Sequence, residues 1–306
     1  MRISTRTFLE QPVTDMTRLQ ATLGVTQQEI ASGVRQSASE PATASRLGAL
    51  DRSVARLAQY ERNAAFVGDR LRSTETAIAD AGDVLQRIHE LAVQAGSGTL
   101  DGASRKLIAA EVRSLRDHLL GVANRIDPNG GYLFGGSRSE QAPFVEHWGI
   151  VQYQGDEALR AVEVLPGRAI ADGVDGGAFA EIQAEGETRD VFAAIDGFAS
   201  ALESVADGSL SEQDFSASIA DTLTISNAGI DHYVLLRARI GGRLATLDSC
   251  LSTRANIHAD LLAQASQLRD LDMAEAISRL QTQLTGLQAA QLSYTKLARL
   301  SLFDYF

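Results

Sequence analysis

Residues 277–306 carry the pattern that most constrains how this chain can fold. Apolar residues recur there at spacings of three and four, and the run ends in Ser-Leu-Phe-Asp-Tyr-Phe. This spacing predicts an amphipathic helix with a coiled-coil stripe. A contiguous apolar stripe is seldom left uncovered in a soluble protein, so we expect another chain to cover it. The residues assigned to this contact are Ile277, Leu280, Leu284, Leu287, Tyr294, Leu297, Leu300, Leu302, Phe303, Tyr305 and Phe306.

The composition supports a slender helical protein. The 306 residues are 44% hydrophobic but only 6% aromatic, which favours packing of Ala, Leu, Ile and Val in helical bundles. The formal net charge of −11 argues against a nucleic-acid partner, because phosphates would be repelled. Apolar runs fall short of the roughly 18 residues that a membrane-spanning helix needs, so we expect no membrane insertion.

The sequence offers no candidate catalytic residue, cofactor site or metal site. The five histidines are scattered, without a second His or Cys at ligand spacing. Serine and cysteine do not occur in a nucleophile-elbow sequence. Cys250 is the only cysteine and is expected to be a small core residue. Residues 1–7 show no pattern of a Sec-type signal, so we do not expect one.

Proline placement predicts two long helical flanks. The sequence has no proline between Pro41 and Pro128 and none after Pro166, and proline is excluded from helix interiors. The second flank predicts a helix over 257–302 that would span about 46 residues, or roughly 70 Å, if unbroken. In the first flank a regular apolar stripe predicts an intramolecular core. Its members are Ile108, Val112, Leu115, Leu119, Val122 and Ile126.

A small β-rich insertion separates the two flanks. Residues 149–153 and 161–165 alternate in polarity like short strands. An insertion within a helical hairpin brings the flanks side by side, so residues 14–31 are expected to lie against 270–300. The apolar residues of this first helix that we assign to the assembly contact are Leu19, Leu23 and Ile30.

The predicted fold is mainly α, a long coiled-coil or helical-bundle rod built from both termini with a small β-rich outer domain inserted. Residues 1–45 and 265–306 are expected to form the N-terminal and C-terminal helices of an inner terminal coiled coil. Residues 46–135 and 188–264 are expected to form the first and second halves of a helical rod. Residues 136–187 are expected to form the outer insertion domain.

Two glycine pairs mark the passage into the insertion. Gly130-Gly131 and Gly135-Gly136 bracket Tyr-Leu-Phe. A phosphate-binding loop would need a strand before it and a helix after it, whereas a helix precedes this segment and β-like sequence follows it. The four glycines therefore predict a domain hinge. The acidic, glycine-rich run at 171–177 lacks the acid spacing of a calcium loop and is expected to be a solvated turn.

Several further stretches follow one another in a distinctive order along the chain. They are Glu29–Arg35 (EIASGVR) with Glu40–Ala42 (EPA), Asn124–Gly136 (NRIDPNGGYLFGG), Ile240–Leu247 (IGGRLATL), Asp270–Ala276 (DLDMAEA) and Ser301–Phe306 (SLFDYF). Together they resemble the flagellin superfamily, and within it the family of hook–filament junction proteins. Val34 stands where that family usually has lysine, and Glu40 stands alone where two acidic residues are common.

This resemblance implies a structural subunit of the bacterial flagellum, without catalytic activity. It implies export through the flagellar type III system, without a cleaved signal peptide, to an extracellular position between hook and filament. The implied partners are further copies of the chain in a ring layer, the first hook-associated protein on the hook side and flagellin on the filament side. An export chaperone is expected to bind the C-terminal helix.

Two alternatives remain open at this point. Within the superfamily the alternative is a flagellin, the filament subunit itself, although the ending Phe303–Phe306 and the YLFGG motif favour the junction family. Outside it the alternative is a helical-bundle enzyme or a cytoplasmic coiled-coil scaffold. An enzyme would need a concave polar site, and a scaffold would remain in the cytoplasm of a cell with an intact export apparatus.

Overall fold

The structure is a computed structural model that describes residues 2–97 and 100–303, with side chains described for 10–97 and 100–296. The chain forms two compact units. One comprises residues 1–57 and 255–306, and the other comprises residues 58–254. We call them the terminal unit and the central unit.

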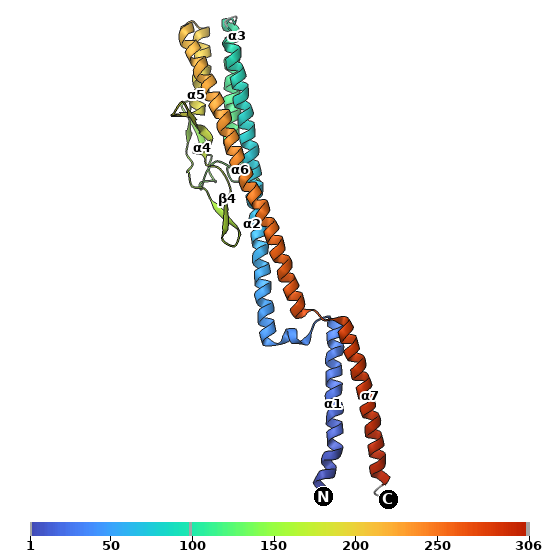
Figure 1. Ribbon diagram of the computed structural model, residues 1–306. Helices are drawn as coiled ribbons and strands as arrows, with labels where there is room; N and C mark the ends of the chain where they lie inside the picture. Colours follow the sequence, from blue (N-terminus) through green and yellow to red (C-terminus); the bar gives the residue numbers. More distant parts are fainter. Residues whose placement is uncertain (1, 98–99, 304–306) are drawn as a thin grey trace. The chain divides into compact units, whose positions relative to one another are not determined.

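Long helices dominate both units (Figure 1). They are α1 (Arg2–Ser32), α2 (Pro41–Ala95), α3 (Gly102–Ala123), α5 (Val191–Ala206), α6 (Glu212–Arg269) and α7 (Met273–Phe303), with the short helix α4 (Gly176–Ala180) and the 3₁₀ turn η1 (Gln36–Ser39). The predicted class, mainly helical with a small β-rich insertion, is confirmed.

The expectation of one unbroken helix over 257–302 is wrong. Helix α6 ends at Arg269 and α7 begins at Met273. The Asp272 carboxylate accepts hydrogen bonds from the backbone N–H groups of Ala274 (2.9 Å) and Glu275 (3.1 Å). A side chain in this position satisfies N–H groups that a helix start leaves without partners. Asp272 therefore starts a second helix where apolar periodicity alone predicts continuation.

The apolar core lies in the central unit, where α2, α3, α5 and α6 pack together (Figure 1). The stripe predicted on α3 takes part in it, with Val112 and Leu119 fully buried. Ile126 differs, since its side chain is 50% exposed. It lies beyond the end of α3, in an isolated β-bridge with Tyr132, so the helical periodicity no longer governs its direction.

The insertion consists of three separate antiparallel hairpins. They are β1 (Phe144–His147) with β2 (Ile150–Tyr153), β3 (Ala161–Leu165) with β4 (Arg168–Ala171), and β5 (Glu181–Ala184) with β6 (Glu187–Asp190). Strands β2 and β3 correspond to the two predicted strands, and the other four were not predicted. A cluster of aromatic rings anchors the insertion to the helices, because Phe179 stacks on Tyr233 of α6 at 5.5 Å between ring centroids.

A buried arginine joins α2 to the turn that follows α3. The Arg70 side chain is 5% exposed and pairs with Asp127, which is 2% exposed. Arg70 also donates to the Tyr132 carbonyl oxygen at 2.8 Å, and its Nε lies 3.7 Å from a carboxylate oxygen of Asp172. The charge is thus compensated from two directions, as a charge removed from water requires.

The same contacts lower the pKa of Asp127. Burial by itself would raise this pKa, but the N–H groups of Gly131 and Asn129 and the Arg70 guanidinium stabilise the carboxylate and more than offset that effect. A depressed folded pKa contributes stability that is present above the unfolded value, about 3.9. This contribution is lost as the pH falls through the lowered folded value.

Replacing Arg70 should strongly destabilise the central unit. Arg70→Met leaves the buried Asp127 without its cation, whereas Asp172 keeps its pairing with Arg160. The loss of a cation from a buried pair costs about 3–5 kcal/mol. Arg237→Met is the matched control, because Arg237 and Glu75 form an exposed pair at 2.7 Å and such pairs contribute about 0–1 kcal/mol. Urea unfolding at neutral pH measures both. Equal losses from the two variants would contradict the assignment of Arg70 as the buried anchor.

Candidate assembly surface on the terminal helices

Helices α1 and α7 lie side by side and antiparallel in the terminal unit (Figure 1). This is the pairing predicted for residues 14–31 with 270–300. An antiparallel β-bridge between Val34 and Asp270 closes one end of the pair. The Arg35 N–H donates to the Arg269 carbonyl at 2.9 Å, and the Leu271 N–H donates to the Gly33 carbonyl at 3.0 Å. These two bonds fix the register of the two helices.

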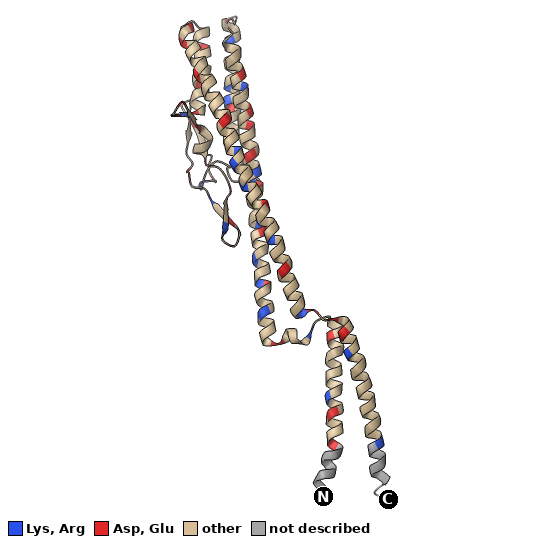
Figure 2. Ribbon diagram, viewed as in Figure 1, with Lys and Arg blue, Asp and Glu red and all other residues tan. Residues whose placement is uncertain are grey.

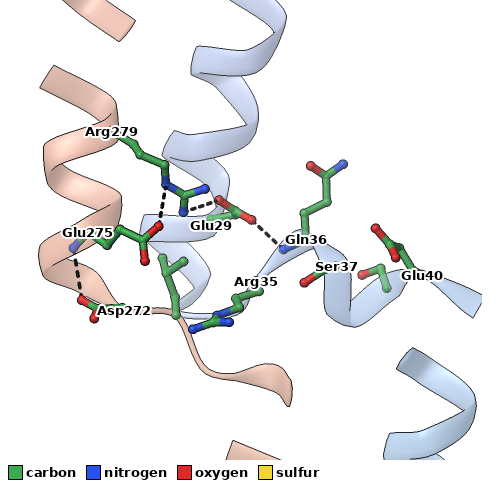
Figure 3. Close-up of a pocket in the computed structure, with 10 residues that line it drawn as sticks. Glu29, Arg35, Gln36, Ser37, Glu40, Asp272, Glu275 and Arg279 are labelled. Atoms are coloured by element: carbon green, nitrogen blue, oxygen red, sulfur yellow. Dashed lines mark hydrogen bonds and ion pairs between the residues drawn. The ribbon is translucent and has the colours of Figure 1, made fainter. Parts of the chain in front are cut away.

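Charged residues reinforce the same end of the pair (Figure 3). The Glu29 carboxylate accepts from the Gln36 N–H at 2.7 Å and lies 3.4 Å from Arg279 of α7. These side chains line an open groove of about 650 Å³, together with Arg35 and Glu275. The groove is polar and is organised by hydrogen bonds within the terminal unit.

Away from this end the two helices carry no charge over long stretches. Residues 19–28 of α1 and 280–295 of α7 contain no Asp, Glu, Lys or Arg, and Figure 2 shows these stretches uncoloured by either sign. Depletion of charge is typical of the buried centre of protein interfaces, because charges cost free energy when water is removed.

The predicted stripe on α7 is only partly buried in the single chain. Ile277 is 45% exposed and Leu284 is 39% exposed. Leu19, Leu23, Ile30, Leu280, Leu287 and Tyr294 are half-buried. Among the side chains that the structure describes in the terminal unit, the buried apolar ones are Ala38, Leu57, Ala265 and Ala276. Pairing of α1 with α7 therefore covers only part of the apolar surface that the two helices present.

The remaining predicted contact residues lie at the edge of what the structure describes. For Leu297, Leu300, Leu302 and Phe303 only the helical backbone is described. Tyr305 and Phe306 lie outside the described residues. The assignment of all these side chains to an assembly contact stays a prediction.

The four predicted hinge glycines occupy a tightly bonded turn of the central unit. Gly130 and Gly136 have positive φ values of +89° and +65°. At Gly136 a Cβ atom would lie 2.1 Å from the backbone oxygen of Asp156, so only glycine fits there. Gly131 donates its N–H to Asp127 at 3.1 Å, and Gly135 packs against the backbone of Arg138. A hinge role stays a prediction, whereas the close approach of the backbone explains these residues directly.

The sequence interpretation missed the charged residues at the bonded end of the terminal pair. Glu29 pairs with Arg279 and Asp272 caps the start of α7, yet none of the three belongs to the apolar stripe. A signal was present for one of them, because Asp272 and Glu275 form the Asp-x-x-Glu spacing that is typical of a helix start. The contact between Glu29 and Arg279 joins residues 250 positions apart, and helical periodicity does not encode it.

The described part of the chain shows no metal site. Among those residues, the structure brings together no group of three or more His, Cys, Asp and Glu side chains able to hold a metal ion. None of the described helices combines the length and the apolar character needed to span a bilayer. Cys250 is buried and free, in agreement with its predicted place in the core.

The terminal helix pair defines a class of protein. Two ends of one chain pair with each other yet leave an uncharged, apolar-striped surface incompletely covered, as subunits of helical assemblies do. Comparison with known proteins then shows what the chain is similar to. The profile of the bacterial flagellin N-terminal helical region matches residues 3–139.

Relatives and solved structures agree with that match. The chain is 29% identical to flagellar hook-associated protein 3 of Escherichia coli K12, over 99% of both chains. It is 27% identical to flagellin of Bacillus subtilis, over 68% of this chain and 66% of the flagellin. A putative flagellar hook-associated protein from Vibrio parahaemolyticus has the same fold, with a TM-score of 0.68 and 22% identity over 75% of this chain and 99% of that one. The resemblance to the hook–filament junction family of the flagellin superfamily is confirmed.

The half-buried stripe should contribute little to the stability of the single chain. Leu280→Ala with Leu287→Ala is expected to cost roughly 1 kcal/mol or less per site, because little apolar area leaves water on folding. The control pair Leu71→Ala and Leu85→Ala removes fully buried side chains and should cost about 2–5 kcal/mol each. Urea unfolding of monomeric protein compares the two. A comparable loss in the stripe variant would show that the stripe is a completed core.

Proposed function

We propose that this protein is a structural subunit of the bacterial flagellum that forms the junction between hook and filament. The observation that carries the proposal is the incompletely covered, uncharged surface of α1 and α7, in a chain similar over its full length to hook-associated protein 3. A junction subunit needs terminal helices that neighbouring subunits can cover. The incompletely covered surface of α1 and α7 is suited to that contact.

Assembly follows from how the surface is built. Head-to-tail contacts between identical subunits generate rings or helical lattices, depending on whether the rotation closes. We infer that the paired terminal helices form the inner shell of such a layer, where the stripe on α7 meets neighbouring copies. The β-rich insertion would then face outward, since it is anchored to the helices through its aromatic side.

Partners follow from the position in the flagellum. On the hook side the chain would contact the first hook-associated protein, and on the filament side it would contact flagellin. Export in an unfolded state suits a terminal unit whose described buried apolar side chains are three alanines and Leu57, because little packing in that unit must be undone. An export chaperone that covers the stripe on α7 would keep it from premature association.

A flagellin is the second candidate function. The match to flagellin of Bacillus subtilis covers about two thirds of each chain, whereas the match to hook-associated protein 3 covers nearly all of both. The described insertion is small, three short hairpins and one short helix. Localisation separates the candidates, because a junction protein forms one narrow band at the hook tip and a flagellin labels the whole filament.

Deletion of the gene tests the proposal. Hooks should persist without filaments while flagellin accumulates in the culture medium, since monomers that find no junction are released. Complementation with Leu280→Asp plus Leu287→Asp should fail and should abolish chaperone binding, because two charges then lie on the stripe. The matched control is Val234→Asp plus Leu235→Asp on α6, whose side chains are 56% and 59% exposed. Normal motility in the deletion strain, or in the stripe variant, would contradict the proposal.

A further inference from the structure

The tip of the β1–β2 hairpin presents the only tryptophan of the sequence to solvent. Trp148 is 101% exposed, and Ile150 beside it is 62% exposed. Tryptophan is highly buried on average, because its ring buries a large apolar area on contact. An indole ring held in water at the end of a hairpin is therefore a feature that the fold of the single chain does not explain.

The backbone at this tip makes the choice of residue more unusual. Trp148 and Gly149 connect the paired residues His147 and Ile150, and both have positive φ values, +55° and +79°. Two-residue hairpin turns of this type favour Asn, Asp or Gly at the first position. A bulky residue there is an outlier, and an observed outlier of this kind is grounds for a functional hypothesis.

A groove on the same unit is large enough to take such a side chain. It lies between β6, α5 and α6 and has a volume of about 460 Å³. Ala193 and Gly197 leave this face of α5 without large side chains, and a Cβ atom at Gly197 would meet nothing within 4 Å. Phe198 lies beneath and is buried. We call this feature the α5 groove.

The polar groups of tip and groove are complementary. The indole N–H is a donor only, and Asp190 and Asp221 are among the residues that line the α5 groove. The Asp190 carboxylate also accepts from the Ala193 N–H at 2.8 Å. Arg189 pairs with Asp221 at 2.9 Å and fixes that carboxylate at the rim. His147, next to Trp148 on the hairpin, would bring an imidazole to the same acidic rim.

We propose that Trp148 of one copy docks in the α5 groove of a second copy of this chain. The inference rests on the proposed function, because it names a contact between neighbouring subunits of the same layer. The full exposure of Trp148 means that it does not fill the groove of its own chain. Tip and groove are built from different residues of one unit, so a contact that is not reciprocated between two copies can repeat from copy to copy. A buried tryptophan in a pocket is the usual form of an interface hot spot.

A photocrosslinking amino acid at the tip tests the contact in living cells. Trp148→p-benzoylphenylalanine keeps an aromatic side chain at the position and is introduced into the deletion strain. Irradiation of flagellated cells should give covalent dimers and higher multimers of this chain. Mass spectrometry should place the crosslink on α5, β6 or α6 at the α5 groove. A crosslink to another protein, or to another surface of this chain, would overturn the inference.

Two substitutions distinguish an effect on docking from an effect on folding. Trp148→Asn gives the Asn-Gly sequence that this turn favours, so the urea unfolding midpoint should be unchanged or higher while flagellin is lost to the medium. Gly197→Leu fills the α5 groove and should give the same loss. Gly121→Leu on α3, another glycine with open space around it, is the control and should retain filaments.

The outcomes distinguish this inference from the function on which it rests. Filaments on cells with Trp148→Asn, and a protein that still localises at the hook tip, would overturn the docking contact and leave the junction role intact. A native protein that does not localise at the hook tip would overturn the junction role itself.

Discussion

The uneven distribution of apolar burial is the constraint on which the rest of the structure depends. Large side chains are fully buried in the central unit, from Leu71 and Ile78 on α2 to Tyr233 on α6. In the terminal unit the described buried apolar residues are three alanines and Leu57. Two helices with a half-covered stripe gain little from packing in isolation, because most helical stability in proteins comes from tertiary burial. We therefore propose that the stripe gains its stabilisation from contacts with neighbouring chains.

The polar groups support this division of roles. Near Glu29 and Asp272 the terminal helices are held in register by backbone bonds and a few charges, and residues 19–28 and 280–295 are uncharged. Such a surface can be covered by another chain without desolvating ions. The central unit instead buries the charge of Arg70 and pairs it with Asp127, which fixes one arrangement of α2 and the turn after α3. One unit is complete in the single chain, and the other is prepared for neighbours.

Much of the fold follows from helical periodicity, and the deviations have physical reasons. The stripes on α3 and α7 are visible in the sequence, because a 3.6-residue period over many turns is a strong signal. Four of the six strands, β1, β4, β5 and β6, were missed, and strands of four residues such as these carry only a weak alternation signal. The break before α7 was missed because one capping carboxylate, that of Asp272, decides it. The apolar period carries no signal for Arg70, whose burial depends on the folded turn at Asp127.

The candidate surface was predictable to a similar extent. Its apolar residues follow from spacing, but the contact between Glu29 and Arg279 depends on tertiary register. Trp148 carries no periodic signal at all, and its significance appears only when the positive φ of the turn and the exposure of the ring are seen together. Local sequence patterns thus predict which helix faces are apolar. The residue pairs that align those faces can be identified only in the folded chain.

Hydrogen exchange of the monomer, followed by mass spectrometry, tests the central claim most directly. Amide protection reports the free energy of local opening. The account predicts strong protection within residues 58–254 and fast exchange in residues 10–45 and 265–296 of the monomer, with protection of these two segments appearing on assembly. Protection of both terminal segments in the monomer equal to that of the central unit would contradict it, because the helix pair would then be complete without neighbours.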